Sequence, residues 1–278
     1  MPFILDFRLD DRGGPVVPGI LIDTLDGASG QAAIRRLAQV EQVVFLVHGF
    51  NVTRPRGRAS LLKLAGLLPA ARSQAVVGVL WPGDSWARAA SYSFEGRDAD
   101  DTAAQLVRFL GDIFPRGATV SFAAHSLGCR VVLETVRALD AGFAVDQVAL
   151  MAGAVDDYSL AWSRAYRAAV QRAKRVAVLA SRCDDVLRLA YPIGDLLQAF
   201  LFFWRDEPGL ALGYHGPRPV REPRQEVPDD VLPKQIDTAS RVNHGDYLPS
   251  AKGPTNKKQL AAAAWLDEVL SGKPQPTY

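Results

Sequence analysis

The chain has 278 residues, 48% of them apolar, which is enough to bury a sizeable core. Its 32 basic and 30 acidic side chains give a formal net charge of +2, so nothing in the charge suggests nucleic acid or an anionic membrane as a partner. The longest apolar patch, residues 196–204, is interrupted by Gln198 and is too short to span a bilayer. The first residues show no basic segment followed by a long apolar one. We therefore expect a cytoplasmic protein without stable membrane insertion.

The sequence contains two cysteines, Cys129 and Cys183. They do not form a C-x-x-C pair, and no group of cysteines and histidines has the spacing of a zinc site. The two cysteines could form one disulfide, but we expect both thiols to be reduced and partly buried. We expect the protein to work without a metal or an organic cofactor.

Short apolar runs alternate with longer helical patterns through the centre of the chain. Strands are predicted at residues 3–9, 19–22, 42–47, 75–80, 118–123, 147–151, 176–180 and, more weakly, 234–239. Helices are predicted at residues 31–39, 61–71, 98–114, 128–139, 159–174, 194–204 and 257–270. We expect the first two strands to be edge strands. The alternation predicts an α/β fold in one domain over 1–278, with a mostly parallel central sheet and helices on both faces.

Residues 191–233 interrupt this regular alternation with a mixed apolar and Pro/Gly/Arg-rich sequence. Loops of this length inside compact domains are often functional lids. The stretch is therefore either a lid or a surface excursion with one helix. The apolar run at residues 200–204 favours the buried face of a helix, with the lining of an acyl pocket as the alternative.

The most informative motif is Ala124-His125-Ser126-Leu127-Gly128, which lies between a predicted strand and a predicted helix. A serine at the apex of a strand–turn–helix is the nucleophile elbow of a large group of hydrolases. The backbones cross closely there, so small residues are needed two positions before and after the serine. Ala124 replaces the more usual glycine. The motif predicts Ser126 as a nucleophile, with a simple helix N-cap as the alternative.

His48-Gly49-Phe50-Asn51 directly follows the predicted strand at 42–47. In hydrolases with such an elbow, this loop supplies one backbone N–H of the oxyanion hole, and the residue after the nucleophile supplies the other. We expect Phe50, or alternatively Asn51, to provide the first donor and Leu127 the second. We expect the ring of His48 to order the loop by hydrogen bonding.

The acid of a Ser–acid–His triad is expected after Ser126 in the chain. Asp184 follows the predicted strand at 176–180 and is the first candidate, with its neighbour Asp185 as the second. Asp156 and Asp157, after the preceding strand, are a third possibility. Each of the four could instead cap a helix.

Four histidines compete for the role of base. His244 lies between the last predicted strand and the final helix, where the base is expected, and His215 in the irregular stretch is the alternative. His48 precedes the serine, which is the wrong order. His125 lies inside the elbow, with its side chain expected to point away from Ser126.

Taken together, the chain resembles the α/β-hydrolase superfamily. More narrowly, it is similar to bacterial esterase/lipase-like proteins of the DUF900 family. The matching segments are VFLVHGFNV at 44–52, AAHSLGCRVVLETV at 123–136, LASRCDDVLRLAY at 179–191 and NHGDYL at 243–248. The resemblance implies an α/β-hydrolase fold, a triad of Ser126, Asp184 and His244, and esterase or lipase-like activity.

The sequence therefore predicts a serine hydrolase that cleaves a small-molecule carboxylic (acyl) ester through an acyl-enzyme. Two alternatives stay open. One is an acyltransferase that uses the same triad, and the other is a non-catalytic binding protein that keeps the fold. A dehalogenase is disfavoured because the elbow carries serine and not aspartate.

Overall fold

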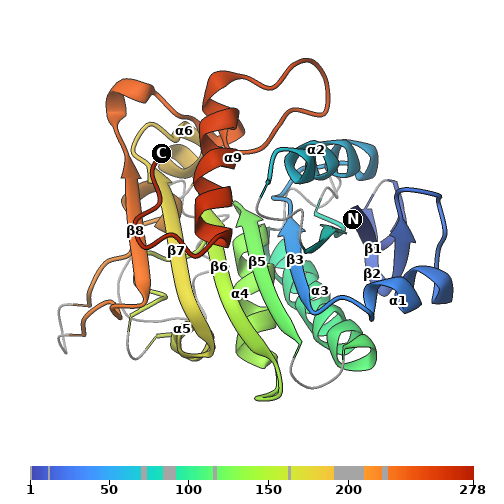
Figure 1. The fold of residues 1–278 in the computed structure, drawn as a ribbon. Coiled ribbons are helices and arrows are strands. Elements are labelled where there is room, and N and C mark those ends of the chain that lie inside the picture. Colours follow the sequence, from blue (N-terminus) through green and yellow to red (C-terminus); the bar gives the residue numbers. More distant parts are fainter. Residues whose placement is uncertain are drawn as a thin grey trace.

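The computed structural model describes residues 2–11, 13–69, 74–83, 92–114, 118–161, 164–190, 210–220 and 225–278. Its centre is an eight-stranded sheet in the order β2-β1-β4-β3-β5-β6-β7-β8 (Figure 1). The strands are β1 (Pro2–Asp10), β2 (Gly13–Asp23), β3 (Gln42–Val47), β4 (Ala75–Leu80), β5 (Thr119–His125), β6 (Ala144–Met151), β7 (Ala173–Ser181) and β8 (Val231–Ile236). β1 and β2 pair antiparallel, and the other neighbouring strands pair parallel.

Helices cover both faces of this sheet. They are α1 (Gln31–Leu37), α2 (Arg54–Gly66), α3 (Tyr92–Ile113), α4 (Gly128–Ala138), α5 (Arg167–Arg172), α6 (Asp185–Ala190), α8 (Leu212–His215) and α9 (Lys257–Leu270), with 3-10 turns η3 (Thr238–Ser240) and η4 (His244–Asp246). In Figure 1, α9 lies on the face turned to the viewer, and α3 and α4 lie behind the sheet. Strands enclosed in this way are apolar on both faces, as in β4, where every residue is buried. This confirms the predicted fold class.

Two helix boundaries show how local sequence sets an element. α9 begins where the sequence predicts, because Asn256 and Gln259 form a capping box at its first turn. α2 begins earlier than predicted, at Arg54, because Thr53 lies at the N-cap and Pro55 in the first turn favours helix initiation.

The helix predicted at 159–174 is wrong. Residues 157–161 form turns, α5 is short, and β7 begins at Ala173, which pairs with Val145 of β6. The side chain of Asp156 accepts the N–H of Tyr158, and Asp156 makes a β-bridge with Ala211. These contacts compete with helical hydrogen bonding and override the apolar periodicity.

Another expectation that fails is the edge position of the first strand. β1 lies inside the sheet between β2 and β4, and β2 alone forms that edge. The burial of Phe3, Ile4, Leu5 and Phe7 follows from this position.

The predicted helix at 194–204 and the apolar run at 200–204 lie outside the described residues. Of the irregular stretch at 191–233, the structure describes 210–220 and 225–233. There, α8 packs against the chain that leaves β6. A Cβ atom at Gly213 would lie 2.1 Å from the carbonyl carbon of Ala152, so only glycine allows this approach.

Within the described ranges, no helix is both long enough and apolar enough to cross a membrane. In the same part of the chain, no group of three histidine, cysteine, aspartate or glutamate side chains is placed to hold a metal ion. Both cysteines are free, with Cys129 buried and Cys183 half-buried.

Candidate active site

Ser126 occupies a strained turn between β5 and α4. Its backbone φ is 54°, in the left-handed region that residues other than glycine rarely adopt. Hydrogen bonds hold it there. Its N–H donates to the Met151 carbonyl at 3.0 Å, and its carbonyl accepts from the N–H groups of Cys129 and Ala154 at 3.0 and 3.2 Å. The strand–turn–helix that the sequence predicts is thus present, with the serine at its apex.

Glycines allow two neighbouring loops to approach this turn. A Cβ atom at Gly128 would lie 2.4 Å from the carbonyl oxygen of His48. One at Gly49 would lie 2.8 Å from the Cβ of Ser126 and 3.0 Å from Nδ1 of His125. The loop after β3 therefore runs directly against the serine, as an oxyanion loop requires.

Replacing Gly49 with alanine is expected to lower kcat toward an ester about 100-fold, because the added methyl group pushes the loop away from Ser126. Steady-state kinetics on p-nitrophenyl esters measure this effect. Gly66→Ala is the matched control, since no atom lies within 4 Å of a Cβ placed there. Equal activities of the two variants would contradict a role for the close approach.

His244 bridges Ser126 and Asp184. Its Nε2 lies 2.9 Å from Ser126 Oγ, and its Nδ1 lies 2.8 Å from Asp184 Oδ2. The carboxylate accepts a hydrogen bond from Nδ1–H, which leaves Nε2 free to accept the serine hydroxyl. The Asp184 side chain is fully buried, whereas 17% of the His244 side chain is exposed. Ser126, Asp184 and His244 come after the carboxyl ends of β5, β7 and β8, respectively.

The other candidate acids have other partners. Asp185 is exposed and pairs with Arg188. Asp157 is buried, and its carboxylate accepts hydrogen bonds from Nε of Arg218 at 2.5 Å and from the N–H of Leu210. Burial raises the pKa of Asp157 to about 7, against the opposing effect of the Arg218 guanidinium. Of the four predicted carboxylates, the one that contacts His244 is Asp184.

His48 orders the loop after β3, as predicted. Its Nδ1–H donates to the carbonyl of Gly49 at 2.8 Å, and its Nε2 accepts the N–H of Trp81 at 3.3 Å. Burial lowers the pKa of His48 to about 4, so the ring is neutral and can make both bonds. The alternative base, His215, lies in α8 with its ring 5.2 Å from that of Tyr214.

Acidification is expected to destabilise the fold through His48. The unfolded chain binds a proton near pH 6.5 and the folded chain only near pH 4, so this contribution is complete above pH 6.5 and is lost as the pH falls toward 4. The difference corresponds to about 3 kcal/mol. Calorimetry between pH 7 and 4 should show a steeper fall in Tm for the wild type than for His48→Gln. Identical slopes would contradict the assignment.

His125 makes a contact that the sequence does not predict. Its Nε2 donates to the backbone carbonyl of His244 at 2.9 Å, and the ring centroids of His125 and His244 lie 4.7 Å apart. Burial holds the pKa of His125 well below its usual value, so the ring is a neutral donor. The residue before the serine thereby supports the loop of the proposed base.

One predicted oxyanion donor, Leu127, directly follows Ser126, and the other, Phe50, follows Gly49 in the loop after β3. Leu127 is buried at the N-cap of α4, and Phe50 is half-buried. The alternative donor, Asn51, directs its N–H to the carbonyl of Gly83 at 2.5 Å. The N–H of Asn51 is therefore already engaged by a backbone carbonyl.

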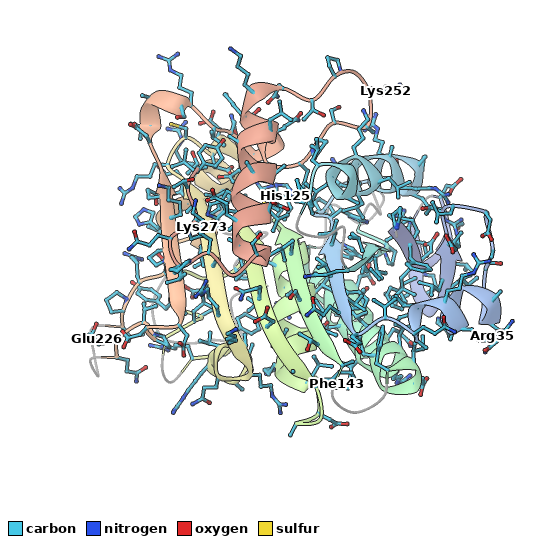
Figure 2. The ribbon with its side chains drawn as sticks, viewed as in Figure 1. Arg35, His125, Phe143, Glu226, Lys252 and Lys273 are labelled. Carbon is cyan, nitrogen blue, oxygen red and sulfur yellow. The ribbon has the colours of Figure 1, made fainter. Side chains whose placement is uncertain are left out.

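A separate hollow of about 450 Å³ lies far from this site. Leu139, Phe143 and Arg172 contribute to its lining. Figure 2 shows Phe143 at the opposite end of the sheet from His125, which marks the serine end. The hollow thus has no part in the chemistry at Ser126.

The site also contains residues that the sequence does not predict. Asn243 is the most important, because its side chain contacts both the acid loop and the base loop. The spacing of Asn243 and Asp246, three residues apart, fits a capping box and could have drawn attention to this turn.

No curated protein matches the chain significantly. Among solved structures it is similar to the ydeN gene product from B. subtilis, with 16% identity over 70% of this chain and 85% of that one and a TM-score of 0.40. The poly(3-hydroxybutyrate) depolymerase LpqC from Bordetella parapertussis shares 16% identity over 85% and 80% of the two chains, with a TM-score of 0.45. Esterase B from Lactobacillus rhamnosis shares 12% over 92% and 82%, also with 0.45. Similarity this distant carries no argument about activity.

A comparison with models of protein families identifies the family of this chain. A model described as an alpha/beta hydrolase of unknown function, DUF900, matches residues 27–196, which is more than half of the chain. The match includes the loop after β3, the turn at Ser126 and Asp184. The chain belongs to the DUF900 family of α/β hydrolases.

Proposed function

We propose that this protein is a serine hydrolase that cleaves small carboxylic (acyl) esters. The observation that carries the proposal is the unbroken hydrogen-bond chain from Ser126 through His244 to Asp184, with links of 2.9 and 2.8 Å. A serine hydroxyl in a strained turn, an imidazole and a buried carboxylate, in this order, are the parts needed for nucleophilic acyl transfer.

The first half of the reaction forms an acyl-enzyme. Nε2 of His244 takes the proton of Ser126 Oγ while Oγ attacks the carbonyl carbon of the ester. Asp184 keeps the proton on Nδ1 and stabilises the imidazolium that forms. The backbone N–H groups of Phe50 and Leu127 hold the oxyanion. His244 then passes its proton to the leaving alcohol, and the C–O bond of the ester breaks.

Water completes the second half. His244 removes a proton from a water molecule, whose oxygen attacks the acyl carbon. Collapse of the tetrahedral intermediate breaks the bond to Ser126 Oγ, which regains its proton from the imidazolium. The products are the free acid and the resting enzyme.

Two assays test the proposal together. A fluorophosphonate probe should label the peptide that carries Ser126, identified by mass spectrometry, and p-nitrophenyl esters of increasing chain length should be hydrolysed. Absence of both labelling and hydrolysis would favour the non-catalytic alternative. Transfer of the acyl group to an added alcohol in preference to water would show that the protein is an acyltransferase and not a hydrolase.

A further inference from the structure

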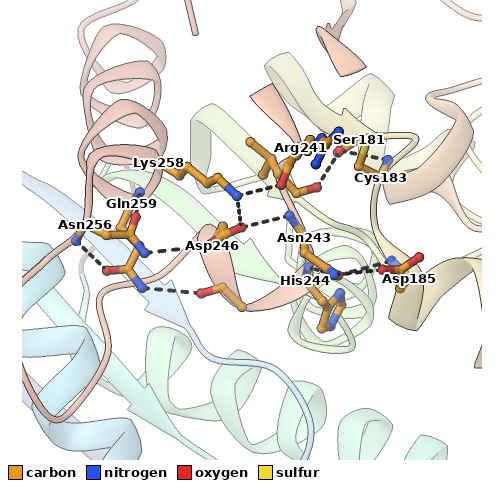
Figure 3. A network of polar contacts seen from close by, with 12 residues as sticks. Ser181, Cys183, Asp185, Arg241, Asn243, His244, Asp246, Asn256, Lys258 and Gln259 are labelled. Carbon is orange, nitrogen blue, oxygen red and sulfur yellow. Dashed lines mark hydrogen bonds and ion pairs between the residues drawn. The ribbon is translucent and has the colours of Figure 1, made fainter. Parts of the chain in front are cut away.

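Two consecutive acids follow β7, and the structure separates their environments. Asp184 is fully buried against His244, whereas 54% of the Asp185 side chain is exposed. Asp185 nevertheless has a defined partner on the loop of the proposed base, namely Asn243, the residue that precedes His244 (Figure 3). The neighbour of the acid thus contacts the neighbour of the base.

The side chain of Asn243 joins these two loops through three hydrogen bonds. Its Oδ1 accepts the backbone N–H of His244 at 2.7 Å and that of Asp185 at 3.1 Å. Its Nδ2 donates to Oδ2 of Asp185 at 3.0 Å. The bond to His244 stays within the turn that Asn243 caps, whereas the two bonds to Asp185 join this turn to the loop after β7.

The turn that begins at Asn243 is itself fixed to α9. The backbone N–H of Asn243 donates to Oδ2 of Asp246 at 2.9 Å, which completes the capping box. The same carboxylate oxygen lies 3.0 Å from Nζ of Lys258, as the dashed lines in Figure 3 show. The turn that carries Asn243 is therefore fixed in place, and Asn243 can hold the loop that carries Asp184 and Asp185.

Both backbone polar groups of His244 are hydrogen-bonded. Its N–H is bonded to Asn243, and its carbonyl to Nε2 of His125. Only the ring remains to be placed, and Asp184 and Ser126 place it. We infer that Asn243 and Asp185 are a positioning pair that sets the separation between Asp184 and His244. The inference rests on the proposed hydrolase function.

The charges explain why the pair combines an amide with a carboxylate. Nδ2 of Asn243 faces the carboxylate of Asp185, so an aspartate at 243 would bring two negative charges together. Repulsion would open the contact between the loops that carry the acid and the base. Displacements of about 1 Å in a catalytic arrangement cost about 100-fold in rate.

An exchange of the two side chains tests this inference. Asn243→Asp should lower kcat on p-nitrophenyl acetate about 30- to 100-fold with little change in KM. Asp185→Asn should stay within about threefold of the wild type, because an amide oxygen still accepts from Asn243. The double variant Asn243→Asp/Asp185→Asn should recover most of the lost kcat, since donor and acceptor are simply exchanged. Fluorophosphonate titration counts the active sites in every sample.

Asp237→Ala is the matched control. Asp237 lies in the same loop, and its side chain caps η3 through the N–H of Ala239 at 2.9 Å. Its loss removes a similar cap, and we expect kcat to be unchanged. A merely structural cap at 243 predicts a different pattern, in which Asn243→Asp is harmless because aspartate is as good an N-cap as asparagine.

The outcomes are distinguishable. Wild-type kcat in Asn243→Asp, or no recovery in a folded double variant, would overturn the positioning pair alone. A wild-type protein that neither hydrolyses esters nor reacts with the probe would remove the proposed function and the inference with it.

Discussion

Replacing Ser126 with alanine is expected to abolish ester hydrolysis, with kcat lowered about 10⁵- to 10⁶-fold. The variant keeps His244 and Asp184 but has no oxygen at the apex of the turn, so no acyl-enzyme can form. Alanine is smaller than serine and fits the same space, and the fold should therefore persist. Labelling by fluorophosphonate should disappear together with activity.

Ser271→Ala is a suitable control for this experiment. Ser271 lies at the C-cap of α9, where its hydroxyl donates to the carbonyl of Asp267 at 2.7 Å. Its replacement should leave both hydrolysis and labelling at the wild-type level. Substantial hydrolysis by Ser126→Ala would mean that another group is the nucleophile.

The second large effect is expected at Asp184. Asp184→Asn should lower kcat about 10⁴-fold, because an amide in place of the carboxylate favours the wrong tautomer of His244 and cannot stabilise the imidazolium. The fold should tolerate the change. The hydrogen bond from the N–H of Leu187 to Oδ1 of Asp184, 3.0 Å long, can be kept by the amide oxygen.

Asp185→Asn makes the same chemical change one residue further along, on an exposed side chain, and should cost no more than about threefold. Steady-state kinetics on one p-nitrophenyl ester compare the two variants directly. A large loss in Asp185→Asn together with normal activity in Asp184→Asn would reverse the assignment of the acid.

The regular part of the fold could be predicted because local pattern and tertiary environment agree there. β3, β4 and β5 are predominantly apolar runs, and they lie in the middle of a sheet covered on both faces. The prediction fails at 159–174, where the helical periodicity is real but the contact between Asp156 and Ala211 decides the local structure. That contact joins residues far apart in the sequence, so no local pattern contains it.

The same distinction applies to the candidate site. The turn at Ser126 is a local feature, and its strand, glycine and helix are contiguous in the sequence. In the sequence Asp184 and Asp185 both follow the strand predicted at 176–180, whereas the structure distinguishes them by burial and by the contact with His244. The bonds from Asn243 to Asp185 and from His125 to His244 could not be foreseen, since they depend on how β5, β7 and β8 lie side by side.

The position of β8 has a consequence for how the protein acquires activity during folding. β8 is an edge strand that pairs with β7, and the segment that carries His244 follows β8 in the chain. Ser126 and Asp184 do not lie on the segment that follows β8, whereas His244 does, so the base cannot be in place until β8 has docked. Ester hydrolysis should therefore not recover during refolding before β8 has docked, so turnover reports when this strand is in place.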